Sequence, residues 1–168
     1  MLRTTLKTVS LSLLTALPVW AGDLPAPTGE VILTLSGNIT VTNGESTAQL
    51  DLAMLEAMAP ATIETTTIWT EGTQVFEGVS LATLVSELGL SGETLRAKAI
   101  NDYEVAVPLA DAVEGGPIIA YRLNGEAMSV RDKGPLWIIY PYDADADYRT
   151  EIIYSRSIWQ LDRIEAVD

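Results

Sequence analysis

The stretch FEGVSLATLVSELG, from Phe76 to Gly89, decides how the rest of the chain is interpreted. Ser80 has a hydroxyl that can cap the first turn of a helix. Apolar side chains then follow at the spacing i, i+3, i+4, i+7, which places them on one helix face: Leu81, Leu84, Val85 and Leu88. Gly89 is the residue type that commonly ends a helix. The pattern predicts a helix over residues 81–88.

Strand patterns surround this helix on both sides. Residues 62–70 are largely β-branched, Asn124-Gly125 is a strong hairpin turn, and residues 136–140 form an apolar run typical of a strand buried on both faces. Further strands are expected at residues 30–42 in two pieces, 94–100, 103–107, 118–123, 127–130 and 158–167. Short helical segments are expected after Asp51, which can cap a helix stopped by Pro60, and over residues 108–113. These elements predict an α+β fold with a mostly β core, sheet-like or barrel-like, and short helices.

The first 21 residues have the pattern of a cleaved export signal. Arg3 and Lys7 precede a short apolar stretch, and Ala21 ends a suitable cleavage site. The apolar run is too short for a membrane-spanning helix, which needs about 20 residues. We therefore expect residues 1–21 to be a signal peptide, residues 22–29 a flexible arm, and residues 30–168 a single domain. The expected location is the periplasm, without membrane insertion after cleavage.

Composition excludes several classes of function. The formal net charge of the 168 residues is −13, and loss of the two cations in the signal makes it −15. So acidic a domain is not expected to bind nucleic acid, which requires clustered Lys and Arg. The chain contains no Cys and no His. Disulfides, the commonest zinc and copper ligands, and the Ser-His-Asp and Cys-His catalytic groups are therefore absent.

An acidic run over Asp143, Asp145 and Asp147 resembles the opening of a calcium-binding loop. An EF-hand loop needs Gly at its sixth position and Glu at its twelfth. Those positions hold Tyr148 and Tyr154. We therefore interpret the run as a solvated turn and expect no metal site.

Two other features could form a binding site. Arg131, Asp132 and Lys133 lie in a turn just before the apolar run, which fits either a loop site or a charged surface turn. Trp69 and Trp159 lie in or near predicted strands, as does Trp137. Because Trp combines a large apolar ring with one N–H donor, the three could line a ligand pocket or pack together in the core.

Several short motifs, in this order, resemble the molybdopterin-binding domain of the sulfite oxidase family, in a small stand-alone exported form. They cover nearly all of residues 30–167: 76–81 leading into the helix, Asn101-Asp102-Tyr103 with 107–109, 123–126, 134–136, and 163–165. The resemblance implies that family's fold.

The departures from the family pattern concern cofactor binding. The resemblance places the molybdenum-binding Cys at Thr65 to Thr67, about four residues before Trp69. A threonine hydroxyl cannot replace a thiolate as a soft ligand. At the positions of two cofactor-binding cations the chain has Trp137, two residues after a Gly-Pro pair, and Trp159, two residues after Ser157. These exchanges remove charge and add flat aromatic faces.

The resemblance therefore suggests a non-catalytic pterin-binding protein without a covalently bound cofactor. Small exported members of this fold resemble pterin-binding signalling proteins, which act with a membrane-bound partner that makes or breaks cyclic di-GMP. Alternatives are a molybdopterin-dependent oxidoreductase that lacks the usual Cys, and an adaptor domain without ligand in which the Trp residues are mutually packed.

The candidate ligand-binding residues fall into three groups. The first group would stack on the pterin: Trp69, Trp137 or Trp159. The second group would pair with the edge of the ring: Asn101, Asp102 or Asp132, with Tyr103 adjoining them. The third group would contact oxygens of the ligand: Arg131, Lys133 and Arg156.

Overall fold

The computed structural model describes residues 24–168. The signal peptide predicted over residues 1–21 lies outside these residues. Within the described part of the chain, no helix has the length and apolar character needed to cross a membrane.

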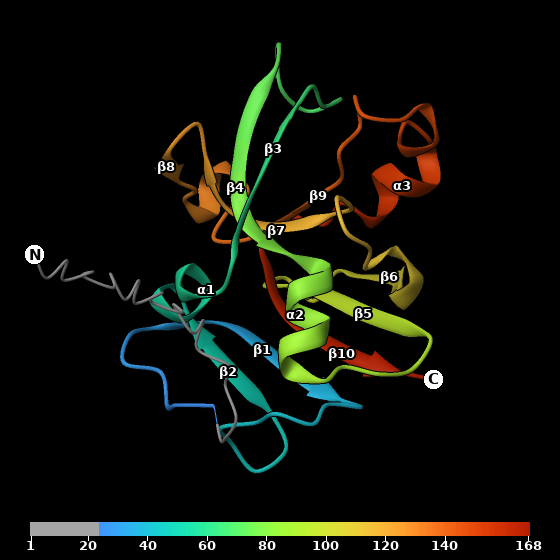
Figure 1. Ribbon diagram of the computed structural model, residues 1–168. Helices are drawn as coiled ribbons and strands as arrows, with labels where there is room; N and C mark the ends of the chain where they lie inside the picture. The colour runs from blue at the N-terminus through green and yellow to red at the C-terminus, as the bar shows by residue number, and fades with distance from the viewer. Residues whose placement is uncertain (1–23) are drawn as a thin grey trace, which may run out of the picture.

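Two sheets enclose one hydrophobic core (Figure 1). The first sheet has the order β2-β1-β10-β5-β6, with strands Ala48–Asp51, Val31–Gly37, Leu161–Val167, Thr94–Ala99 and Glu104–Pro108. In this sheet only β1 and β10 run parallel. The second sheet is antiparallel, with the order β3-β4-β7-β8 and β9 also on β7; its strands are Pro60–Thr65, Gln74–Ser80, Ile118–Leu123, Glu126–Ala127 and Trp137–Ile139.

Short helices connect and cover the strands. They are α1 (Leu52–Ala57), α2 (Leu81–Leu88) and α3 (Glu151–Arg156), with the 3-10 turns η1 (Leu109–Asp111), η2 (Val130–Asp132) and η3 (Ala146–Tyr148). The predicted class, α+β with a mostly β core and short helices, is confirmed.

The helix predicted over residues 81–88 is confirmed as α2. The Ser80 hydroxyl accepts a hydrogen bond from the Thr83 N–H at 2.9 Å, and Gly89 ends the helix with a left-handed backbone. Leu81, Leu84 and Leu88 are buried, and Val85 is partly buried against the core. The helix packs against β4, whose last residue is its N-cap, so this stretch connects the two sheets (Figure 1).

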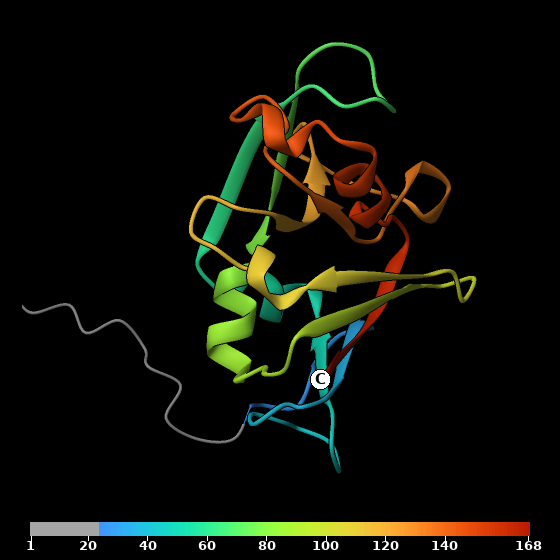
Figure 2. The same cartoon turned by 90° about the vertical axis from the view of Figure 1, so that its right-hand side faces the viewer.

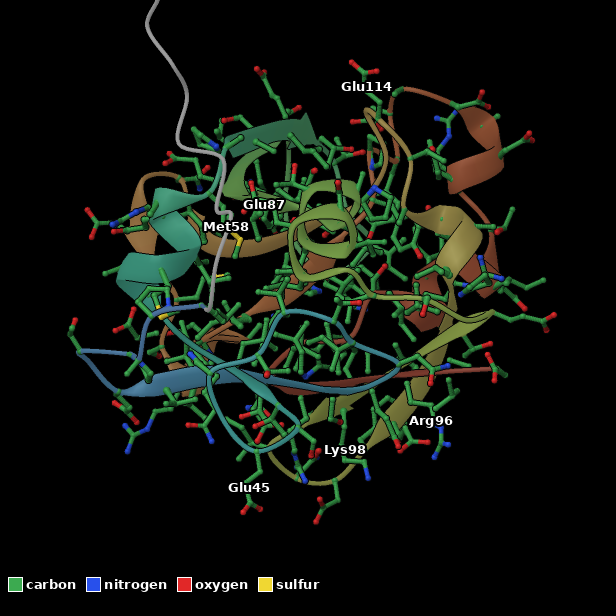
Figure 3. All side chains as sticks on the ribbon, turned by 60° about the horizontal axis from the view of Figure 1, so that its bottom comes forward. Glu45, Met58, Glu87, Arg96, Lys98 and Glu114 are labelled. Carbon is green, nitrogen blue, oxygen red and sulfur yellow. The ribbon has the colours of Figure 1, made fainter. Side chains whose placement is uncertain are left out.

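The first sheet has one buried and one solvent-facing side. Along β5, Leu95 and Ala97 are buried, while Arg96 and Lys98 point away from α2 on the outer side (Figure 3). Arg96 pairs with a carboxylate of β10 at 3.3 Å. An exposed ion pair contributes only about 0–1 kcal/mol, so we assign the stability of this sheet to its buried side.

The strand predicted at 127–130 is wrong beyond Ala127, because β8 ends there and Val130 belongs to η2. Three other predicted strands are shorter in the structure, for local reasons. Residues 30–42 give only β1, because the N–H groups of Thr40 and Val41 bond to the carbonyl of Leu88 at the end of α2. β3 ends at Thr65, since Asp143 binds the next residue. β10 starts at residue 161, after Gln160 with its left-handed backbone.

The segment expected to be a loose arm is anchored in its described part. Leu24 is buried, and the N–H groups of Thr28 and Gly29 donate to the Asp51 carboxylate at 2.8 and 2.7 Å. The same carboxylate caps α1 through the Met54 N–H at 2.9 Å, as the sequence predicted for Asp51. One side chain therefore joins the start of the domain to α1.

Replacement of Leu84 tests the role of α2. Leu84→Ala removes a fully buried side chain and is expected to lower the free energy of unfolding by about 2–5 kcal/mol. Ser86→Ala, on the exposed side of the same helix, is expected to change it by less than about 0.5 kcal/mol. Urea denaturation measures both, and equal losses would contradict the assignment of α2 to the core.

Asp51 also predicts a dependence of stability on pH. The N–H groups of Gly29 and Met54 lower the pKa of Asp51 below its usual value of 3.8. A carboxyl with a depressed pKa in the folded state stabilises the protein above the unfolded-state pKa, and this contribution is lost as the pH falls through the folded-state pKa. The stability gap between the wild type and Asp51→Asn should therefore be widest at pH 7 and shrink below about pH 4. A gap that stays constant from pH 7 to pH 2.5 in urea titrations would contradict this role.

Candidate functional site

A pocket of about 350 Å³ lies between the β5–β6 hairpin and the segment that follows α3. Figure 2 shows this hairpin projecting from the body of the molecule below α3. The volume of the pocket is at the lower end of the range of about 300–1,000 Å³ typical of small-molecule sites. Its walls are mostly apolar and are formed by Trp69, Ala99, Asn101, Tyr103, Tyr154, Ser155, Ser157, Ile158, Trp159 and Gln160.

Trp69 is the central ring of an aromatic cluster behind the pocket. Its ring centroid lies 5.6 Å from that of Trp137, 5.7 Å from Tyr154, 5.9 Å from Trp159 and 6.2 Å from Tyr142, all in edge-to-face geometry. Edge-to-face packing is a preferred arrangement of aromatic rings. The pocket wall at Trp69 is therefore held by rings from several segments.

Trp137 supports the pocket but does not line it. Its side chain is 0% exposed, and its indole N–H donates to the carbonyl of Ser157 at 3.0 Å. This buried position leaves no ring face open for the stacking predicted for Trp137. Trp159 is 39% exposed and lines the pocket. The two tryptophans at the positions where the resemblance expects cations therefore differ: Trp137 lies in the core and Trp159 lies in the pocket wall.

The structure brings four of the predicted site residues together in the pocket walls: Trp69, Asn101, Tyr103 and Trp159. Tyr103 is 58% exposed, and Trp159 is also partly open to solvent. The Asn101 carboxamide oxygen accepts the Tyr103 N–H at 3.1 Å, which fixes the turn between β5 and β6. The predicted turn at Asn101-Asp102 is thus part of the site.

The predicted charged residues do not line the pocket. Asp102 pairs with Arg163 at 3.0 Å, and Asp132 accepts a hydrogen bond from the Ser129 hydroxyl at 2.7 Å. Arg131 is exposed on η2, next to Asp132. None of these three side chains lines the pocket, and sequence spacing did not reveal the partners of Asp102 and Asp132.

The remaining two cations are also placed outside the pocket. The Lys133 ammonium lies 5.6 Å from the centroid of the Trp137 ring, within cation–π range. Arg156 donates to the Asp111 carboxylate at 2.8 Å. This bond fixes α3 to η1, because Asp111 lies in η1. Asp111 also accepts a hydrogen bond from the Tyr140 hydroxyl at 2.6 Å.

Two buried tyrosines strengthen the support of α3. Burial and the bond to Asp111 raise the pKa of Tyr140 far above its usual value. Burial raises the pKa of Tyr142 to about 12, and its hydroxyl donates to Ser157 at 2.6 Å. Both hydroxyls remain protonated donors at neutral pH. They hold the segment that carries Tyr154 and Ser157 into the pocket wall.

Sequence reasoning missed the part of the wall contributed by α3. Tyr154, Ser155 and Gln160 come from a helix and a turn that periodicity did not predict. A local signal existed, since Thr150 caps α3 by accepting the Ile153 N–H at 3.3 Å. The six-residue helix is too short for an apolar period to stand out.

The position expected for a metal-binding Cys holds a hydrogen-bonded threonine pair. Thr65 is 0% exposed, and its hydroxyl accepts the Asp143 N–H at 3.1 Å. Thr66 donates to the Asp143 carboxylate from its N–H at 2.6 Å and from its hydroxyl at 2.8 Å. These hydrogen bonds lower the pKa of Asp143, and the bond from the Thr66 N–H has the largest effect. Asp143 therefore has a structural role here.

Residues 40–144 match the family model described as the oxidoreductase molybdopterin binding domain. The chain belongs to this family. Its structure is similar to the crystal structure of the sulfane dehydrogenase SoxCD from Paracoccus pantotrophus, with a TM-score of 0.59 and 17% sequence identity. The similarity covers 81% of this chain but 38% of that chain, so it shows the fold alone. No curated protein sequence matches.

The residues of this site do not fit a molybdenum-bearing, phosphorylated molybdopterin. Thr65 offers no thiolate, and within residues 24–168 no group of three or more His, Cys, Asp or Glu is placed to hold a metal ion. Neither Lys nor Arg lines the aromatic pocket to bind a phosphate. Family membership therefore gives the fold, while the described residues of this pocket lack the thiolate and the cations that such a cofactor would need.

The two tryptophans are expected to differ in their effect on stability. Trp137→Ala leaves a large cavity in the core and should lower the free energy of unfolding by about 3–5 kcal/mol. Trp159→Ala removes a partly exposed ring and should cost clearly less. Urea denaturation at pH 7 measures both values, and a larger loss for Trp159→Ala would contradict the assigned roles.

Proposed function

We propose that this chain is a non-catalytic pterin-binding protein that uses the family fold to hold a pterin without metal or phosphate. The observation that carries this proposal is the composition of the pocket. Its walls include Trp69, Tyr103, Tyr154 and Trp159, but no cation. A flat, neutral heterocycle gains dispersion and stacking against such walls.

The pocket also offers polar groups for the ring edge. A pterin ring carries an amino group and an amide, which together donate and accept hydrogen bonds. Asn101 and Gln160 both line the pocket, and a carboxamide side chain can donate and accept. Aromatic walls combined with a few polar groups are typical of sites that recognise heterocycles.

Charge argues against a phosphorylated ligand. Cations close to the pocket in sequence are engaged elsewhere: Arg156 pairs with Asp111, Lys98 with Glu104, and Arg163 with Asp102. A phosphate in the aromatic pocket would lose hydration without gaining a cationic partner. The acidic surface of the chain, with a net charge of −13, would repel it as well.

Two other functions have support. Family membership favours a molybdopterin-dependent oxidoreductase, which would need a metal ligand other than the thiolate that Thr65 lacks. The mutual packing of Trp69, Trp137 and Trp159 favours an adaptor domain without ligand. We prefer the pterin-binding function because the packed rings still leave an aromatic pocket.

Periplasmic location and a signalling role are part of the proposal. They rest on the export pattern of residues 1–21 and on the resemblance to signalling proteins that act with a membrane-bound cyclic di-GMP enzyme. Exposed apolar side chains lie on segments that also supply pocket walls: Ile68, Ile100 and Ile152. A partner that contacts these segments would sense the ligand directly beside its interface.

A fluorescence titration tests the proposed function. Neopterin is expected to quench the tryptophan fluorescence of the protein to saturation. Since a stacked ring contributes about 1–3 kcal/mol, Trp159→Ala should weaken binding at least about fivefold. Neopterin monophosphate should bind more weakly than neopterin.

Tyr148→Ala is the matched control, because Tyr148 is a half-buried aromatic residue packed on Tyr140 and does not line the pocket. It should leave the affinity for neopterin unchanged. Absence of saturable quenching, or tighter binding of the phosphate ester, would contradict the proposal.

A further inference from the structure

Residues with a left-handed backbone gather beside the pocket. Among the described non-glycine residues with positive φ are Asp102 at 66°, Lys133 at 72° and Gln160 at 53°. Gln160 lines the pocket, Asp102 adjoins the lining residues Asn101 and Tyr103, and the Lys133 carbonyl is bonded to Gln160. Such conformations persist only where the surroundings hold them, and they cluster at functional sites.

Gln160 connects three segments through its backbone and side chain. Its N–H donates to the Lys133 carbonyl at 3.0 Å, and its own carbonyl accepts the Ile100 N–H at 2.9 Å. Its side-chain nitrogen donates to the Val130 carbonyl at 2.7 Å. One pocket residue is thus bonded to the η2 loop and to the start of the turn between β5 and β6.

The η2 loop, residues 128–136, is the connection between β8 and β9, which both pair with β7. Its internal bonds converge on Ser129, whose carbonyl accepts the N–H groups of Asp132 and Gly134 at 2.9 and 2.7 Å. Its bonds to Gln160 reach both ends of η2. The loop exposes Val130 and Arg131 to solvent.

We propose that Gln160 transmits occupancy of the pocket to the η2 loop. This inference rests on the proposed function. A pterin that donates to the carboxamide oxygen of Gln160 fixes this side chain in the orientation in which its nitrogen holds the Val130 carbonyl. The η2 loop then opens less often, and the surface at Val130 and Arg131 becomes ordered.

The coupling needs a contact that differs between the two states of the loop, since a ligand shifts an equilibrium only by its differential affinity. The carboxamide of Gln160 supplies this contact, because it can face the ligand with one atom and the loop with the other. Gln160 is therefore a positioning residue, and the η2 loop is the element whose order changes.

Hydrogen exchange of the full exported chain, with neopterin as the probe, tests this inference. Saturating neopterin should slow exchange at the Asp132 and Gly134 amides by about tenfold, within the usual range of about 5–150-fold for allosteric coupling. Gln160→Ala keeps the Cβ atom and both backbone hydrogen bonds. The cost of the left-handed backbone at residue 160 is therefore similar in the variant and the wild type. Because Gln160 also lines the pocket, this variant should bind neopterin more weakly. At the higher neopterin concentration that saturates its quenching, it should show no ligand-dependent slowing in the loop.

Gln49→Ala is the matched control, an exposed Gln on β2, and it should behave as the wild type. Quenching without slowed exchange in the wild type, or slowing that persists in Gln160→Ala at saturation, would overturn the coupling and leave pterin binding intact. Absence of quenching in the wild type would overturn the proposed function and the coupling with it.

Discussion

The burial of the Trp137 ring, with its N–H satisfied by the Ser157 carbonyl, is the interaction on which the site depends. This bond joins β9 to the segment that follows α3, and it keeps the only polar atom of a large side chain paired inside the core. The ring then supports Trp69 and Trp159 at 5.6 and 6.3 Å. Loss of the Trp137 ring would remove one support from each of these two pocket residues.

The same position shows how the family fold has been adapted. The resemblance places a cofactor-binding cation at Trp137 and another at Trp159. Here one ring fills the core and the other faces the pocket. A cation in a buried aromatic cluster would require a paired anion. A Trp at this position instead contributes apolar packing and carries no charge that could bind a phosphate. Thr65 is bonded to the Asp143 loop and offers no thiolate.

Sequence patterns predicted the elements whose signals are local. The cap, apolar period and terminal glycine of α2 lie within ten residues of one another, and the cap of α1 at Asp51 is equally local. The buried strand β9 follows from an unbroken apolar run. By contrast, the sequence predicts no strand at β4, because residues 74–80 lack a clear alternation.

Site residues were predicted less well because their roles depend on distant partners. Nothing near Arg156 in the sequence indicates that Asp111 will bind it, and nothing near Lys133 indicates its position beside the buried Trp137 ring. Hydropathy likewise cannot separate Trp137 from Trp159, since both are apolar residues in or beside strands. The pocket emerges only when α3 and the β5–β6 hairpin are brought together.

The central claim is that this oxidoreductase-family fold holds a pterin free of metal and phosphate. The most direct test is to purify the protein from a molybdenum-replete host, denature it, and analyse the released ligand and metal. We predict a pterin without phosphate and molybdenum far below one atom per chain. One molybdenum atom per chain together with released molybdopterin would contradict the claim.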